Sequence, residues 1–239
     1  MTRPPVVGLL YPGYAAEDDF PALENALGGA IWLPVIHTSI GRDEHTVEAL
    51  LDTGSAARLA EGADAIAAHS PDAVMWACTS GSFVYGPDGA AAQAAAISER
   101  LGIPASSTSI AFIEAARALG LERVAVAASY PADLAEHFRS FLAAGGIEVV
   151  SFGASGIFTA VDVGRLGPEA VAEMVAAVDV PEAEAVLVPD TAMHTLTCID
   201  TLEKELGKPV LTANQVTVWE GLRIAGKPRP LPGLGALFR

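Results

Sequence analysis

Residues 73–82 read Ala-Val-Met-Trp-Ala-Cys-Thr-Ser-Gly-Ser, and a similar stretch, Ala-Val-Leu-Val-Pro-Asp-Thr-Ala-Met-His, occupies residues 185–194. Each stretch begins with an apolar run typical of a buried strand and changes to small and polar residues where that strand would end. Cys78 in the first stretch aligns with Asp190 in the second, and a threonine follows each of them. The repeat predicts two similar α/β halves, each with one ionisable group at a strand end.

Predicted strands and helices alternate along the whole chain, which favours parallel sheets with helices on both faces. We expect two pseudo-symmetric halves, each a short parallel sheet flanked by helices. The first half would comprise residues 1–115 and 215–239, and the second residues 116–214. Ligands of such sheets bind beyond the carboxyl ends of the strands. The predicted active site is therefore the cleft between the halves.

Several individual elements are predicted from local patterns in the sequence. An apolar run predicts a strand over residues 30–36, and helical spacing of leucines predicts one helix over residues 46–61. Residues 153–166 are expected to form a loop, and residues 195–206 a helix. The Pro- and Gly-rich tail, residues 226–239, is expected to lie along the surface.

Composition excludes several classes of protein. The chain has 239 residues, of which 51% are hydrophobic and 18% charged, with a formal net charge of -15. Nucleic-acid binding needs clustered Lys and Arg, so this charge argues against it. A small anionic substrate is still possible, because local backbone N–H groups can bind a carboxylate. No apolar run reaches the ~20 residues that a membrane span needs.

The two cysteines form no disulfide framework, which predicts a reducing, cytoplasmic compartment. Cys78 is either a small buried hydrophobe or a reactive group. It follows an apolar run, where backbone N–H groups or a helix N-terminus would lower its thiol pKa and make it a nucleophile or base. Cys198 lies within a predicted helix and is expected to be structural.

Asp190 also has two interpretations. It could be the N-cap of a helix that begins near Thr191, or a general acid or base opposite Cys78. His194 could hydrogen-bond Asp190, reach the cleft, or be a half-exposed structural residue. No close pair of ligands has a recognised metal spacing, so no metal site is predicted.

Hydroxyl groups near the predicted strand ends could bind a carboxylate. Thr79 and Ser80 could donate to it or serve only turn chemistry. Tyr130 could be a donor or a packed aromatic, and Tyr11 and Pro12 also follow a predicted strand. A Gly-x-Gly-x-x-Gly phosphate loop is absent, so no nucleotide cofactor is expected.

At these residues the sequence resembles the maleate isomerase and arylmalonate decarboxylase branch of the aspartate/glutamate racemase superfamily. The resemblance covers most of the chain, and no single motif carries it. It rests on the order and spacing of Gly-Leu-Leu-Tyr-Pro at 8–12, Ala-Cys-Thr-Ser at 77–80, Arg-Ala-Leu-Gly at 117–120, Arg-Val-Ala at 123–125, Tyr130, Leu-Glu-Lys-Glu-Leu-Gly-Lys-Pro-Val at 202–210 and the tail from Pro232 to Phe238.

The resemblance implies an active site between two halves, with no metal or organic cofactor. The racemases and isomerases of this family use two cysteines, and Cys78 matches the first, whereas Asp190 stands at the second. Arylmalonate decarboxylases keep the second cysteine and lack the first, so the chain matches neither pattern. The resemblance also implies a carboxylate pocket, whose donors match Thr79, Ser80, Tyr130 and the backbone of Thr191 and Ala192. Ala192 replaces a glycine.

Three functions remain open from the sequence. The first is a cofactor-free isomerase or racemase of a small carboxylic acid, with Cys78 as nucleophile or base and Asp190 as the opposed acid/base. The second is a decarboxylase of substituted malonates, and the third is a non-catalytic binder of small carboxylates. Rapid alkylation of Cys78 at neutral pH would favour an enzyme. The protein is expected to be a monomer or a homodimer.

Overall fold

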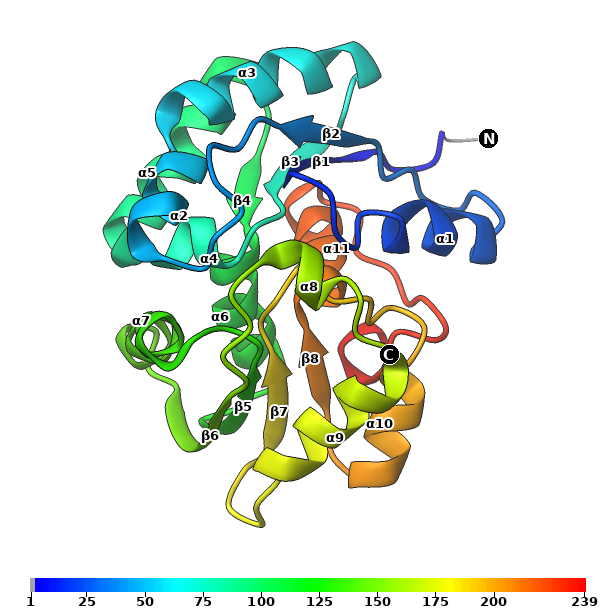
Figure 1. The fold of residues 1–239 in the computed structure, drawn as a ribbon. Helices are drawn as coiled ribbons and strands as arrows, with labels where there is room; N and C mark the ends of the chain where they lie inside the picture. The colour runs from blue at the N-terminus through cyan, green and yellow to red at the C-terminus, as the bar shows by residue number, and fades with distance from the viewer. Residues whose placement is uncertain (1–2) are drawn as a thin grey trace.

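The computed structural model describes residues 3–239 and contains two four-stranded sheets, one above the other in Figure 1. The first sheet has the order β2 (Val35–Thr38), β1 (Val7–Pro12), β3 (Ala73–Trp76), β4 (Ala105–Ser107). The second has the order β6 (Glu148–Ala154), β5 (Arg123–Ala128), β7 (Ala185–Val188), β8 (Val210–Thr212). All neighbouring strands are parallel. The shared topology confirms the prediction of two similar α/β halves.

Helices flank each sheet. Those of the first half are α1 (Asp19–Ala26), α2 (Val47–Thr53), α3 (Ala56–Ile66), α4 (Ser80–Phe83) and α5 (Gly86–Leu101). Those of the second are α7 (Ala132–Ala144), α8 (Ala160–Val163), α9 (Pro168–Val178) and α10 (Ile199–Leu206). Within residues 3–239, none of the helices combines the length and the apolar character needed to cross a bilayer.

Two further helices join the halves. α6 (Thr108–Ala118) and α11 (Ala213–Ile224) pack against each other, and α11 also contacts strands of both sheets. One hydrophobic cluster contains Leu9 and Met75 from the first sheet together with Val126 and Leu187 from the second. The halves therefore share a continuous core. The predicted divisions of the chain, at 115/116 and 214/215, fall within these two helices and stay a prediction.

The second strand lies further along the chain than predicted. The prediction placed it over residues 30–36, whereas β2 begins only after Pro34, and Trp32 makes a single bridge to Val6. Proline has no N–H to donate, so a regular ladder begins beyond it. Because β2 is an edge strand, the exposed His37 fits within it.

The single helix predicted over residues 46–61 is wrong, because the structure has two helices, α2 and α3, separated at Gly54. A Cβ on Gly54 would lie 2.2 Å from the carbonyl oxygen of Gly81. The chain therefore turns where its backbone passes close to the segment that follows β3. Ser55 precedes the second helix with extended backbone.

The helix predicted over residues 195–206 begins only at Ile199. The reason lies in the other half of the protein, where the buried carboxylate of Asp19 accepts hydrogen bonds from the backbone N–H of Thr195 (2.9 Å) and of Leu196 (3.2 Å). These two N–H groups are held by Asp19 instead of starting a helix. Cys198 is consequently at the N-cap of α10 and not inside it.

Two segments are more ordered and more buried than predicted. Residues 153–166, predicted as a loop, contain the end of β6 and the short helix α8. The tail lies partly inside the core, because it carries the buried residues Leu231, Leu234, Leu237 and Phe238. The Gln215 side chain donates to the Leu234 carbonyl at 2.9 Å, which anchors the tail to α11.

Candidate active site

Cys78 and Asp190 hold equivalent places in the two halves. Each comes two residues after the last residue of its strand, Trp76 in β3 and Val188 in β7. Both are buried, with 4% of their surface exposed. The turns that follow parallel strands meet at one edge of the sheets, so the fold brings the thiol and the carboxylate to the same region.

Both residues line one small cavity, with a volume of about 50 Å³. Of the other residues predicted for the site, Tyr11, Pro12, Ser80, Thr191 and Ala192 line it too. Thr79 and Tyr130 are fully buried and are not part of this lining. The sequence reasoning missed a group that covers the cavity from the first half, comprising Ile40, Arg42, Asp43, Glu44 and His45, and it missed Ala160 from the second.

Cys78 is a neutral thiol at physiological pH. Burial raises its pKa from 9.0 to about 11, the hydrogen bonds from Gly81 and Ser80 lower it, and the Asp190 charge raises it. The Gly81 N–H donates to Cys78 Sγ at 3.2 Å, as expected for the residue after a strand. The predicted lowering of this pKa is nevertheless wrong, because desolvation of the thiolate is the larger effect.

We expect iodoacetamide to alkylate native Cys78 more slowly than a small free thiol at neutral pH, because about one Cys78 in ten thousand is then a thiolate. The rate should rise about tenfold per pH unit until about pH 11. Intact-mass measurements on a Cys198→Ser variant isolate this rate. A plateau at or below pH 9 would contradict the raised pKa. Slow alkylation thus does not mark a non-catalytic protein.

Asp190 is not a helix N-cap, because the next helix, α10, begins at Ile199. Its Oδ1 accepts the Ala192 N–H at 2.9 Å, which closes a tight turn. Its Oδ2 accepts a hydrogen bond from the Ser129 hydroxyl at the end of β5. The Ala192 N–H, which the family resemblance implied as a substrate donor, is thus used by Asp190. The carboxylate is fixed from two sides and faces the cavity.

Two buried phenols support the turn that carries Asp190. The Tyr11 hydroxyl donates to the Thr191 carbonyl at 3.0 Å, and the Tyr130 hydroxyl donates to the Pro189 carbonyl at 2.8 Å. Burial raises the pKa of both tyrosines well above the usual range, and the Asp190 charge raises it further. Both therefore stay protonated. Their hydroxyl hydrogens position the backbone around Asp190.

The predicted hydroxyl donors differ in their surroundings. Ser80 Oγ lies 3.8 Å from Cys78 Sγ, at the cavity wall. Thr79 Oγ1 is fully buried and has no hydrogen-bond partner among residues 3–239.

His194 does not bond Asp190. Its Nε2 lies 2.7 Å from the Asp18 carboxylate, and it is not part of the cavity wall. In the described part of the chain, no group of three or more His, Cys, Asp or Glu side chains could hold a metal ion.

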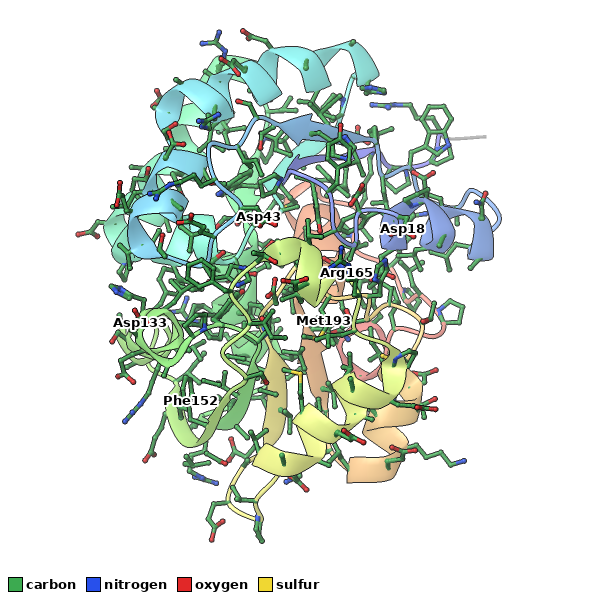
Figure 2. All side chains as sticks on the ribbon, in the orientation of Figure 1. Asp18, Asp43, Asp133, Phe152, Arg165 and Met193 are labelled. Atoms are coloured by element: carbon green, nitrogen blue, oxygen red, sulfur yellow. The ribbon has the colours of Figure 1, made fainter. Side chains whose placement is uncertain are left out.

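The cover of the cavity joins both halves. The Asp43 carboxylate accepts the backbone N–H of Ala160 at 2.9 Å and of Val161 at 3.2 Å. A second contact between the halves is the hydrogen bond from the His45 backbone N–H to the Phe158 carbonyl, at 2.7 Å. Figure 2 shows Asp43 beside α8, at the boundary between the halves. No sequence motif identifies residues 40–45. The predicted second strand ends at residue 36, whereas β2 ends at Thr38, just before these residues.

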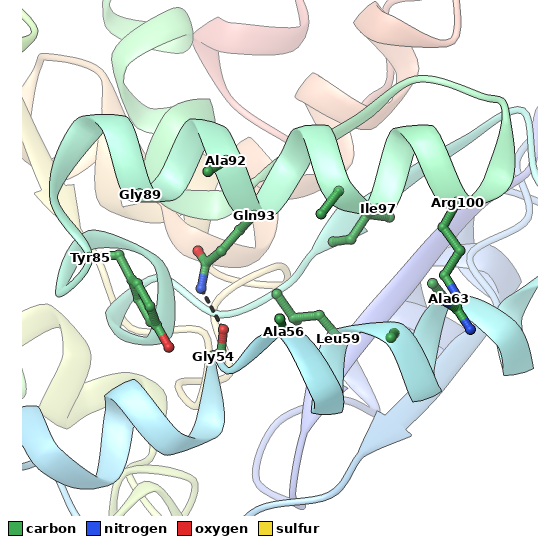
Figure 3. Close-up of a pocket in the computed structure, with 12 residues that line it drawn as sticks. Gly54, Ala56, Leu59, Ala63, Tyr85, Gly89, Ala92, Gln93, Ile97 and Arg100 are labelled. Carbon is green, nitrogen blue, oxygen red and sulfur yellow. Dashed lines mark hydrogen bonds between the residues drawn. The ribbon is translucent and has the colours of Figure 1, made fainter.

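Gln93 holds the segment that carries the thiol. It lines an apolar pocket between α3 and α5, and its Nε2 donates to the carbonyls of Gly54 (2.8 Å) and Gly81 (2.9 Å). Figure 3 shows the first of these bonds. Gly81 in turn donates to Cys78, so a buried amide fixes the turn beside the thiol.

We expect Gln93→Met to destabilise the protein by about 2 kcal/mol, because two buried carbonyls lose their donor while the side-chain length is kept. Denaturant unfolding of wild type and variant measures this difference. Gln93→Glu is no substitute, since it would bury a charge. An unchanged unfolding midpoint would show that these carbonyls need no donor.

The fold and this cavity place a thiol and a carboxylate together between two α/β halves, and comparison with known proteins gives the family of the chain. The family model of arylmalonate decarboxylase matches residues 48–238. The arylmalonate decarboxylase of Bordetella bronchiseptica is 30% identical over 245 residues, covering 100% of this chain and 95% of that protein. The chain belongs to the arylmalonate decarboxylase family.

Maleate isomerases are similar as well. That of Nocardia farcinica is 30% identical over 180 residues, covering 73% of this chain and 72% of that protein. A structure of a cysteine-to-serine mutant of the Nocardia farcinica maleate cis-trans isomerase, with a covalently bound succinylcysteine intermediate, superposes with a TM-score of 0.89 at 27% identity and 98% coverage of both chains. These relatives agree with the branch that the sequence resembles.

Proposed function

We propose that the protein is a cofactor-free cis-trans isomerase of a small unsaturated carboxylic acid such as maleate, acting through Cys78 with Asp190 as the opposed acid/base. One observation carries the proposal. A buried thiol and a buried carboxylate, held at equivalent strand ends of two similar halves, line the same small cavity. The covalent succinylcysteine of the Nocardia farcinica isomerase supports a cysteine adduct as the intermediate.

The proton and electron movements balance without a cofactor. The resting thiol is protonated, so Asp190 first accepts the Cys78 proton. The thiolate then adds to one alkene carbon, and the π electrons move to the neighbouring carbon and its carboxylate. The remaining C–C single bond rotates, the electron pair re-forms the double bond, and the thiolate leaves. Asp190 finally returns the proton to sulfur.

Ser80 and the Gly81 N–H lie where charge changes during these steps. Both contact the Cys78 sulfur, so they can stabilise the thiolate as it forms and leaves. The hydrogen bonds from Ser129 and Ala192 fix the Asp190 carboxylate in the wall of the cavity that Cys78 also lines, so the base can act without a rearrangement of its turn.

Decarboxylation of a substituted malonate is the second candidate. The raised pKa of Cys78 favours it, since a thiol that keeps its proton can protonate a carbanion. A cavity of about 50 Å³, however, suits a small acid better than an aryl group. This difference in size makes the isomerase the preferred function.

Proton NMR in deuterated water tests the proposal with maleate, substituted malonates, amino acids and hydantoins. The expected result is loss of the maleate vinyl signal and growth of the fumarate signal. Carbon dioxide loss from a malonate without isomerisation would assign the decarboxylase instead. Exchange of α-protons in amino acids or hydantoins would assign a racemase, and no change in any compound would refute the proposal.

A further inference from the structure

His45 is a buried imidazole in the active-site cavity that the steps above do not use. It follows β2, is 5% exposed, and lines the same cavity as Cys78 and Asp190. Its ring meets the Tyr130 ring edge-on, with the centroids 5.1 Å apart and an interplanar angle of 89°. An imidazole N–H can donate a hydrogen bond to a carboxylate, so His45 is a candidate contact for a ligand in this cavity.

The hydrogen bonds of His45 decide which ring nitrogen is left to bind a ligand. Nδ1 lies 2.8 Å from the Ile157 carbonyl oxygen, and a carbonyl only accepts, so Nδ1 carries a hydrogen in both charge states. The backbone N–H is bound to the Phe158 carbonyl. Nε2 has no hydrogen-bond partner among residues 3–239. The ring is therefore fixed by the second half of the protein, and Nε2 is left for an occupant of the cavity.

The charges around the cavity show why a ligand would need His45 Nε2. A carboxylate substrate would enter beside Asp190, and burying two negative charges together is unfavourable without a cation. Among residues 3–239, Arg42 and His45 are the only residues lining this cavity that can be cationic. The Arg42 side chain is 51% exposed and bridges Glu44 at 3.3 Å and Glu48 at 3.1 Å. Its charge is thus already balanced and solvated, which leaves the imidazole.

We propose that His45 Nε2 takes up one proton when the substrate binds and donates it in a hydrogen bond to the substrate carboxylate. His45 would then be a substrate-binding residue whose charge offsets that of Asp190. The proton comes from solvent and returns there when product leaves. The other titratable or charged groups around the imidazole are Tyr11, Arg42, Asp43, Glu44, Cys78, Tyr130 and Asp190. This inference rests on the proposed function.

Titration calorimetry of maleate binding to Cys78→Ser, in buffers of different ionisation enthalpy, measures the proton uptake directly. We expect about one proton per maleate bound, and affinity that falls as pH rises. Adding His45→Asn should abolish the uptake and weaken binding about tenfold or more. Asparagine can still donate to the Ile157 carbonyl, so it removes the titrating nitrogen with little loss of structure. Adding Asp190→Asn should leave the uptake intact.

Three results would overturn the inference. The first is proton uptake that persists when His45→Asn is added to Cys78→Ser. The second is proton uptake that disappears when Asp190→Asn is added to Cys78→Ser. The third is maleate binding to Cys78→Ser without proton uptake. If His45→Asn does not fold, ¹⁵N NMR of histidine-labelled Cys78→Ser decides, because the chain has only five histidines. The Nε2 signal should move to the protonated position with maleate, and an unmoved signal refutes the inference. Failure of the proposed function would appear separately, as wild type that does not isomerise maleate.

Discussion

Cys78→Ser is expected to lower kcat by about a thousandfold or more, because it replaces the nucleophile by a group that a carboxylate cannot deprotonate at neutral pH. The cavity wall would change little, since a hydroxyl can still accept the Gly81 N–H that now contacts Sγ. The melting temperature should therefore stay nearly unchanged. Steady-state kinetics and thermal unfolding on the same preparation measure both quantities. Cys78→Ala should give the same loss of turnover.

The matched control is Cys198→Ser. Cys198 lies at the start of α10 and donates its S–H to the Thr195 carbonyl, outside the cavity lining. Burial raises its pKa to about 11 as well, so the two thiols differ in position and not in acidity. Activity should survive this change. Activity lost in Cys198→Ser but retained in Cys78→Ser would reverse the assignment.

Asp190→Asn is expected to reduce kcat by about a hundredfold to ten-thousandfold while KM changes little, because it removes the acid/base and keeps the shape. The asparagine oxygen can still accept the Ala192 N–H, and the Ser129 hydroxyl can rotate to accept from the new amide. The turn should therefore persist. Kinetics at several pH values, with maleate binding measured separately, distinguish a lost proton transfer from a lost site.

Ser129→Ala provides the control for Asp190. It removes one hydrogen bond to the carboxylate and leaves the carboxylate in place, so the effect on kcat should be smaller than that of Asp190→Asn. Normal turnover in Asp190→Asn would show that the carboxylate only closes its turn with Ala192. In that case the two-base mechanism is wrong.

The internal repeat allowed the architecture and the central pair to be predicted. Apolar runs of four residues are buried strands in both halves, and the parallel order follows from alternation with helices. The positions of Cys78 and Asp190 after β3 and β7 follow from the same periodic pattern. These features depend on local sequence, which is why they could be found without a structure.

Long-range contacts account for what the sequence did not reveal. Asp19 delays α10 through hydrogen bonds to residues far along the chain, and no local pattern encodes them. His45 is held at the cavity by a hydrogen bond to the Ile157 carbonyl, which lies far along the chain, so its place in the site could not be predicted from local sequence. The raised pKa of Cys78 depends on burial by both halves, whereas the sequence suggested only the nearby N–H groups.

The most direct test of the central claim is mass spectrometry of acid-quenched wild type and Asp190→Asn after incubation with maleate. If Cys78 is the nucleophile and Asp190 the base that takes its proton, the wild type should carry an adduct with the mass of maleic acid on the peptide that contains Cys78. Asp190→Asn should carry far less of this adduct, because its thiol stays protonated. The Cys78→Ser variant should carry none. An adduct on Cys198 alone, no adduct on Cys78 in a wild type that isomerises maleate, or an undiminished Cys78 adduct in Asp190→Asn would contradict the mechanism.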